Sequence, residues 1–497
     1  MIARTTKFFK KYYFVISVLL VSGVLRWVLI FRGGQFYFPD ESRYGVAQDA
    51  LALLLDGKVR TALLTLVSEL AHVGFKLTAL IPALFENLFH TSLALPAIFF
   101  SFFSIFSLLL IWMIALRAGA TRRVANYALL IAAASHVLLY YSRHIFPYDQ
   151  AMFFGLLALF VALGNINKTS NLLLCGTISF LCLVTYNGYW QMAIFPMLVG
   201  VFIGVKEKYW FIRRPFFLGL GFFTSLAILL LACFVIGKDF FSDYGVYLQK
   251  IIQGSFSEGW KLPFEYFWHA EHGFILLVGF LGLVSLYLFW KQQNTFLYIA
   301  LGGTFFMYVS LVIPSNITHT FVVYARTARQ IMPFLVMTAA YGLAYFHSWK
   351  PGGRWLVNIA LAVFFVQAAW NYGIAYEITF PGEFVQEIQA REPGFEISSK
   401  MVRFYAPLVC EEGGLVVENY HYIYTWPQAV PPVEGNILMR APHPINVLYY
   451  QYDGYTPAER AAIRGEYFEM VLYKPDASYL ASFKKEIENC NQREKGN

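Results

Sequence analysis

Charged residues are scarce in this chain of 497 residues: 14% are Asp, Glu, Lys or Arg, against about 25% in an ordinary soluble domain. Because 58% of the residues are hydrophobic, that scarcity excludes a water-soluble globule. Apolar runs of about 20 residues, each long enough to cross roughly 30 Å of hydrocarbon, recur along most of the sequence. The composition therefore predicts a polytopic α-helical membrane protein.

Other absences from the sequence exclude further classes of protein. The sequence contains no glycine pattern of the dinucleotide-binding or P-loop type and no solenoid-type repeat. Its five cysteines form no metal-binding motif. Three of them, Cys175, Cys182 and Cys233, fall in apolar runs and are expected to be small buried hydrophobes. Cys410 and Cys490 could pair if the tail is extracytoplasmic, and the sequence leaves that pairing open.

Eleven apolar runs are expected to span the membrane, and the loops between them carry charge in a regular way. The expected spans are 12–31, 93–116, 124–141, 150–164, 171–186, 189–205, 215–236, 273–290, 296–313, 330–347 and 355–372. The first is too long for a signal peptide and is expected to stay uncleaved, with its N-terminus cytoplasmic. Short inside loops then contain Arg117, Arg122, Arg123, Lys168, Lys206, Lys208, Arg213, Arg214, Lys291, Lys350 and Arg354. This is the positive-inside pattern, and it explains the net charge of +8 without nucleic-acid binding.

Acidic residues of the membrane part gather on the opposite, outer face. They are Asp40, Glu41, Asp49, Asp56, Glu69, Glu86, Asp149, Asp239, Asp243, Glu258, Glu265 and Glu271. This assignment depends on residues 72–89, which are apolar but short and interrupted by Lys76, Pro82 and Glu86. They are expected to form an amphipathic helix in the outer interface, inside a first outer loop over 32–92.

Two domains are expected, a membrane domain over 1–372 and an extracytoplasmic α/β domain over 373–497. In the first, the outer loop 237–272 is dense in aromatics, which suits an interfacial belt or the wall of a site for a lipid-linked ligand. In the second, strand-like runs alternate with helix-like ones at 383–391 and 457–464.

Three outer clusters carry groups that can do chemistry. Asp40-Glu41-Ser42-Arg43-Tyr44 follows the first span, residues 140–149 lie between the third and fourth spans, and Arg326 and Arg329 precede a later one. Ionisable groups held at a membrane boundary indicate a functional site. A carboxylate can deprotonate a hydroxyl, and cations can hold a phosphate leaving group. Transfer of a sugar from a polyprenyl phosphate to a hydroxyl needs both.

These motifs resemble the GT-C-fold glycosyltransferases, especially the protein O-mannosyltransferases and the lipid A aminoarabinose transferases. The resemblance is carried by Asp40-Glu41 with Arg43-Tyr44, by Tyr141-Ser142-Arg143 through Asp149, and by Arg329 before Ile331-Met332-Pro333. It covers roughly 1–372. One departure stands out: His72 is followed by Val73-Gly74 where the family has two prolines.

The resemblance implies a role for each candidate residue. Asp40 would be the catalytic base, Glu41 would orient the loop or the acceptor, and Asp149 would assist through a bound divalent cation or by steadying Arg143. The donor phosphate would be held by Arg143, Arg326, Arg329 and Lys76. Further site residues would be Arg43, Tyr44, His72 and His144. No cofactor is implied with certainty, and metal use is open.

The resemblance thus implies inverting sugar transfer from a polyprenyl-phosphate donor to a lipid, glycan or protein, at the outer face of a bacterial or archaeal plasma membrane. A transporter or flippase of a lipid-linked or anionic solute is the alternative. However, transporters tend to hold ionisable groups near the midplane, and here the spans are nearly free of charge, with Arg26 as an exception. An inactive scaffold that presents the tail is a third interpretation. For single residues, Asp40 could form a plain salt bridge with Arg43, Asp149 could be an N-cap, and the two later arginines could snorkel to headgroups.

Overall fold

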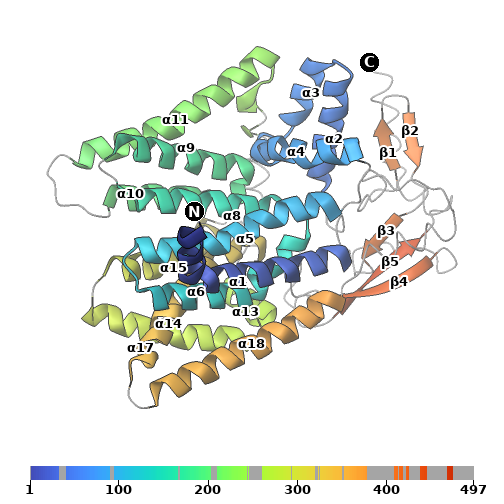
Figure 1. The fold of residues 1–497 in the computed structure, drawn as a ribbon. Coiled ribbons are helices and arrows are strands. Elements are labelled where there is room, and N and C mark those ends of the chain that lie inside the picture. Colours follow the sequence, from blue (N-terminus) through green and yellow to red (C-terminus); the bar gives the residue numbers. More distant parts are fainter. Residues whose placement is uncertain are drawn as a thin grey trace.

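A computed structural model gives the fold of the chain. It describes residues 2–32, 41–89, 94–165, 168–202, 210–242, 244–245, 260–271, 273–292, 294–318, 323, 325–349 and 352–377, and five short strands between 408 and 473. Asp40 lies outside these residues. The described part of the membrane region is helical, as its composition predicts, and its helices run side by side (Figure 1).

Each of the eleven expected spans coincides with helix in the structure. The corresponding elements are α1 (Ile2–Arg32), α5 (Ala94–Arg117), α6 (Arg122–Ala134) with α7 (His136–Leu139), α8 (Pro147–Ala162), α9 (Thr169–Thr185), α10 (Trp190–Phe202), α11 (Trp210–Ile236), α14 (Phe274–Lys291), α15 (Thr295–Ile313), α17 (Met332–His347) and α18 (Gly353–Glu377). Among the described residues, six helices are long and apolar enough to cross a membrane, or up to eight if two bent pairs each count as one span. The count of eleven spans stays a prediction.

The helices pack in an order that differs from their order in the chain. Neighbouring pairs follow the series α11, α9, α8, α5, α6, α17 and α14. At α9 and α11 the backbones meet directly: a Cβ on Gly176 would lie 2.1 Å from the Leu218 carbonyl oxygen, and one on Gly221 would lie 2.1 Å from that of Leu173. Small residues permit such close approach between membrane helices. These two glycines therefore fix the spacing of this pair.

One expected span is broken rather than straight. The segment α6 meets the stretch formed by α7 and the 3-10 helix η3 (Tyr140–Arg143) at an angle of 72°. Ser135 makes the break, because its backbone is extended (φ −68°, ψ 123°) and its hydroxyl accepts from the N–H of Leu138, as an N-cap does. The bend turns the chain toward Asp149 at the start of α8.

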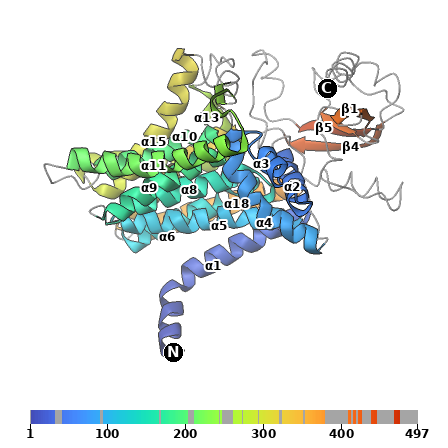
Figure 2. The same ribbon diagram turned by 90° about the horizontal axis from the view of Figure 1, so that it is seen from above.

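The shorter helices that follow α1 in the chain lie at one end of the bundle in both views (Figure 1, Figure 2). They are α2 (Ser42–Leu55), α3 (Val59–Leu66), η2 (Leu70–His72) and α4 (Val73–Phe89). The helix expected over 72–89 is thus present, with Pro82 inside it. Together with η2 it meets α3 at 83°, which also fits a broken span, so its interfacial position stays a prediction.

The remaining helical elements carry or flank the candidate site. They are η4 (Asn187–Tyr189), α13 (Leu262–Glu271), the π-helical turn η5 (Pro314–Thr318), α16 (Ala325–Ala328) and η6 (Arg329–Ile331). Helix α13 forms the C-terminal part of the aromatic loop 237–272.

Five antiparallel strands represent the C-terminal region. β1 (Leu408–Glu411) pairs with β2 (Gly414–Val417), while β3 (His421–Tyr424), β5 (Tyr467–Tyr473) and β4 (Ile437–Pro444) form a sheet in the order β3-β5-β4. These strands agree with several of the strand-like runs in the sequence. The helices expected at 383–391 and 457–464, and Cys490, lie outside the described residues, so the α/β domain stays a prediction.

Candidate active site

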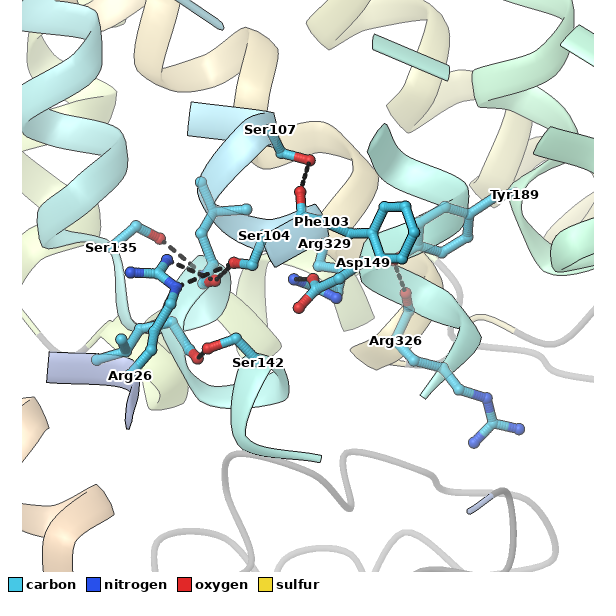
Figure 3. Close-up of polar contacts among 12 residues, drawn as sticks. Arg26, Phe103, Ser104, Ser107, Ser135, Ser142, Asp149, Tyr189, Arg326 and Arg329 are labelled. Carbon is cyan, nitrogen blue, oxygen red and sulfur yellow. Dashed lines mark hydrogen bonds and ion pairs between the residues drawn. The ribbon is translucent and has the colours of Figure 1, made fainter. Parts of the chain in front are cut away.

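Asp149 and Arg329 form a buried ion pair at the centre of the candidate site (Figure 3). Asp149 stands in the first turn of α8, and Arg329 begins η6 just before α17. An Nη2–H group of Arg329 donates to Asp149 Oδ1 at 2.5 Å. The guanidinium also lies over the ring of Tyr141, with Cζ 4.5 Å from the ring centre. Thus two of the sequence clusters, 180 residues apart, meet in one contact.

Arg329 has N–H donors that its contact with Asp149 does not use. Its side chain is fully buried, and its Nε and Nη1 atoms have no hydrogen-bond partner among the described residues. A guanidinium carries five N–H donors in a fork that matches a phosphate. A buried donor without an acceptor is costly, and the Nε and Nη1 groups have the chemistry to donate to an anion besides Asp149.

Arg326 lies beside this pair and is held by tyrosines. Its Nε donates to the hydroxyl of Tyr186 at 2.9 Å, and the hydroxyl of Tyr189 donates to the Arg326 carbonyl at 2.8 Å. Neither tyrosine was predictable from the sequence, because aromatic residues are frequent throughout the chain.

Glu41 and His144 form a second, adjacent group. Glu41 is fully buried, and its Oε1 accepts the backbone N–H of Ile145 at 2.9 Å. Its Oε2 lies 3.5 Å from Nδ1 of His144. Glu41 therefore anchors the start of α2 to the segment that leads into α8. This geometry suits the orienting role that the resemblance implies.

Arg143 faces a different element from the other arginines. Its Nη1 donates to the carbonyl of Ala375 at 2.6 Å, near the end of α18. Arg143 is buried and within electrostatic reach of Glu41. A part of its hydrogen-bonding capacity is thus used to join η3 to α18.

The remaining candidates lie between α1 and α5. Lys76 is buried and donates to the Ser68 hydroxyl at 3.0 Å, whereas Arg43 pairs with Glu69 at 3.1 Å. The Tyr44 hydroxyl donates to Glu86 at 2.7 Å. These contacts join α2, α4 and the turn between α3 and α4.

A series of aromatic rings, each in contact with the next, links His72 to His144. His72 stacks on Tyr186 with centroids 5.5 Å apart, and Tyr186 contacts Tyr148 at 4.8 Å. From there Phe146 follows at 4.9 Å, and His144 lies another 4.9 Å on. The structure therefore brings Glu41, His72, His144, Asp149, Arg326 and Arg329 around one aromatic cluster. In the described part of the chain, no three His, Cys, Asp or Glu side chains come together as metal ligands.

We expect Glu41→Ala to destabilise the protein, because it leaves the buried N–H of Ile145 without its acceptor. The free energy of unfolding should fall by about 1–3 kcal/mol. Thermal unfolding in detergent measures this. Glu41→Gln keeps an acceptor and should lose less, and Asp56→Ala, which breaks only an exposed ion pair with Lys58, should change little. Equal loss in Glu41→Ala and Asp56→Ala would contradict the anchoring role.

Two buried charges that were not predicted as site residues hold the broken helix next to this cluster. Glu271, the last residue of α13, accepts from the Ser135 hydroxyl (2.5 Å) and from the N–H groups of His136 (3.0 Å) and Val137 (2.8 Å). Burial raises the pKa of this carboxyl to about 7, while the three donors act in the opposite direction. Arg26, from α1, donates to the Leu138 carbonyl at 3.3 Å and to the Ser104 hydroxyl at 3.1 Å (Figure 3). The only signal for Arg26 in the sequence is its charge inside an apolar span.

An apolar groove of about 950 Å³ lies among α13, α14, α15 and α17. Ile331 and Leu335, which follow Arg329 in the chain, contribute to its wall. The rest of the wall comes from α13, α14 and α15, including Phe267, Phe280 and Phe305. Several lining residues, such as Leu283, are exposed on the outer surface of the bundle. The groove has the apolar lining that a hydrocarbon chain requires.

Comparison with known proteins gives likenesses of structure only. No protein-family model matches the chain, and no curated protein matches its sequence. Among solved structures, ArnT from Cupriavidus metallidurans bound to undecaprenyl phosphate is 13% identical, with 76% of this chain and 73% of that chain covered and a TM-score of 0.49. The oligosaccharyltransferase AglB from Archaeoglobus fulgidus, in complex with an inhibitory peptide and a dolichol-phosphate, is 11% identical, with 79% and 61% covered and a TM-score of 0.45. The chain spans about three fifths of the length of AglB.

Both likenesses concern the arrangement of the helices alone. The inference about activity therefore depends on the side chains of the site.

Proposed function

We propose that this protein transfers a sugar from a polyprenyl-phosphate donor to a hydroxyl acceptor at the outer face of the membrane. The observation that carries the proposal is the buried fork of Arg329, whose Nε and Nη1 atoms have no hydrogen-bond partner among the described residues, followed in the chain by Ile331 and Leu335 in the wall of an apolar groove. A phosphate on a long isoprenoid chain has both matching parts: an anion for the fork and a tail for the groove. The proposal includes eleven spans, a cytoplasmic N-terminus and an extracytoplasmic C-terminal domain.

The proposed reaction is a single displacement with inversion. Asp40 takes the proton of the acceptor hydroxyl, and the resulting oxygen attacks the anomeric carbon of the sugar. The bond from that carbon to the phosphate oxygen breaks, and the polyprenyl phosphate leaves with the electron pair. Arg329 stabilises the charge that develops on the phosphate, and Asp149 holds the guanidinium in place. Arg326, whose Nε donates to the Tyr186 hydroxyl, is the second cation for the phosphate in this proposal.

Two measurements test this function. Purified protein in proteoliposomes, supplied with labelled polyprenyl-phosphate sugars, should release polyprenyl phosphate and give a labelled product. Mass spectrometry of lipids, glycans and proteins from cells with and without the chain should identify the sugar and the acceptor together. Movement of a lipid-linked sugar across sealed vesicles without covalent transfer would instead support the flippase alternative.

Filling the groove should discriminate between long and short donors. A Cβ at Gly279 on α14 would meet no atom within 4 Å, so Gly279→Phe can enter the groove without a clash with the backbone. We expect the KM for a long-chain donor to rise about tenfold, because two methylene groups that lose burial cost about 1.6 kcal/mol. The KM for a donor with a chain too short to reach Gly279 should stay constant.

Gly373→Phe is the matched control for this substitution. Gly373 is also a helical glycine with open space around it, but it lies on α18 and does not line the groove. Steady-state kinetics on both variants, with both donors, gives the comparison. An equal rise in KM for long and short donors would refute the placement of the tail.

A further inference from the structure

The four-residue helix α7 is too short to be stable by itself. Isolated helices shorter than about 12 residues are marginal in water, because nucleation fixes several dihedrals for one hydrogen bond. Its geometry must therefore come from contacts with other elements. The structure provides such contacts at both ends.

Glu271 satisfies the N-terminal end of α7. The first N–H groups of a helix have no partner within it, and the partial positive charge there favours an anion. The carboxylate accepts two of these groups, from His136 and Val137, together with the hydroxyl of Ser135. Glu271 belongs to α13, so this contact joins the aromatic outer loop to the break in α6–α7.

Arg26 satisfies the C-terminal end of the same helix. The Leu138 carbonyl accepts from Nη2 of Arg26 at 3.3 Å and from the hydroxyl of Ser104 at 3.2 Å. The negative end of the helix dipole favours a cation at this place. Carboxylate and guanidinium thus stand at opposite ends of one turn of helix, each at the end that suits its charge.

The residues after α7 are those of the site. Tyr141, on η3, lies against the guanidinium of Arg329 at 4.5 Å. Ile145 donates to Glu41, and Asp149 follows four residues later. A shift of α7 would therefore move the ring and the carboxylate that hold Arg329.

We infer that Glu271 and Arg26 are positioning residues that hold α7 from its two ends and so fix the place of Tyr141 and Asp149 around Arg329. The inference rests on the proposed function for its effect on transfer. Its structural part, the two-ended support of α7, is independent of any reaction.

The kinetic test uses Glu271→Gln, Arg26→Gln and the double variant in the proteoliposome assay. We expect each single change to lower kcat at least about tenfold, because a misplacement of about 1 Å can cost 10²-fold. The KM for the donor should change less than about twofold, since the apolar groove is intact. Because both residues act through α7, the double variant should lose little more than the worse single variant. Additive losses, or full activity in Glu271→Gln, would overturn the inference.

Two matched controls separate positioning from general damage. Asp239→Asn alters another carboxylate of the same outer loop that accepts two backbone N–H groups, from Phe241 and Ser242. Trp27→Phe removes a hydrogen bond from α1 to Ser101 of α5, next to Arg26, without touching α7. Both should keep kcat within about twofold of the original protein.

A second measurement needs no activity. In hydrogen–deuterium exchange, the amides of His136 and Val137 should exchange faster in Glu271→Ala, while those of α9 remain protected. Glu271→Gln serves if the alanine variant does not fold. If the original protein transfers no sugar, the proposed function fails, but the exchange result still decides whether Glu271 supports α7. Unchanged protection of both amides in Glu271→Ala and Glu271→Gln would overturn that support.

Discussion

Asp40→Asn should abolish sugar transfer while the protein still folds and inserts into the membrane. The change keeps the size and polarity of the side chain but removes the proposed base. General base catalysis contributes typically 10² to 10⁴-fold, so we expect a loss of about 10³-fold in kcat. The measurement is transfer from a labelled polyprenyl-phosphate sugar in membranes, normalised to the amount of folded protein.

Asp56→Asn is the control for this change. Asp56 belongs to the same outer loop but is exposed and forms only a 3.7 Å ion pair with Lys58. It should retain normal transfer. Near-normal activity in Asp40→Asn would remove Asp40 from the chemistry, and a loss in both variants would indicate damage to the loop.

Arg329→Gln is expected to have the second large effect, on both activity and stability. Loss of one preorganised donor to a developing anion costs about 10²–10³-fold in kcat. The change also leaves the Asp149 carboxylate buried without its partner, and breaking a buried ion pair costs about 3–5 kcal/mol. Transfer assays and thermal unfolding in detergent measure the two effects separately.

The double variant Arg329→Gln with Asp149→Asn distinguishes the two effects. It removes both charges, so much of the stability lost in Arg329→Gln should return, whereas transfer should stay low. Arg213→Gln, which changes an exposed arginine bonded to Thr169, should alter neither quantity. Recovery of transfer in the double variant would contradict the role of Arg329 as the phosphate ligand.

Local features of the site were predictable because they depend on short sequence patterns. Apolar runs located the helices, and the sequence of 72–89 predicted the helix that is present there. The assignment of the acids, Arg143 and Arg329 to one outer face stays a prediction. The resemblance in Asp40-Glu41 and in Arg329 to Pro333 predicted a helical fold of the GT-C type.

Features that depend on distant contacts were not predictable. Residues 124–141 form one continuous apolar run in the sequence, because Ser135 is small. The break in the helix at Ser135 depends on Glu271, 136 residues away. Likewise, nothing near Glu41 indicates that its carboxylate accepts the N–H of Ile145, 104 residues later. Asp40 lies outside the described residues, so its role stays a prediction from sequence.

The position of Arg26 has a consequence for biogenesis. An arginine at the centre of a membrane helix costs up to about 3 kcal/mol during insertion by the translocon. The groups that satisfy its guanidinium in the finished fold, Ser104 and the Leu138 carbonyl, lie 78 and 112 residues further along the chain. During synthesis the first span therefore carries a charge without these partners until α5 and α7 have emerged from the ribosome. Helix α1 thus reaches its final environment only after several later helices have entered the bilayer.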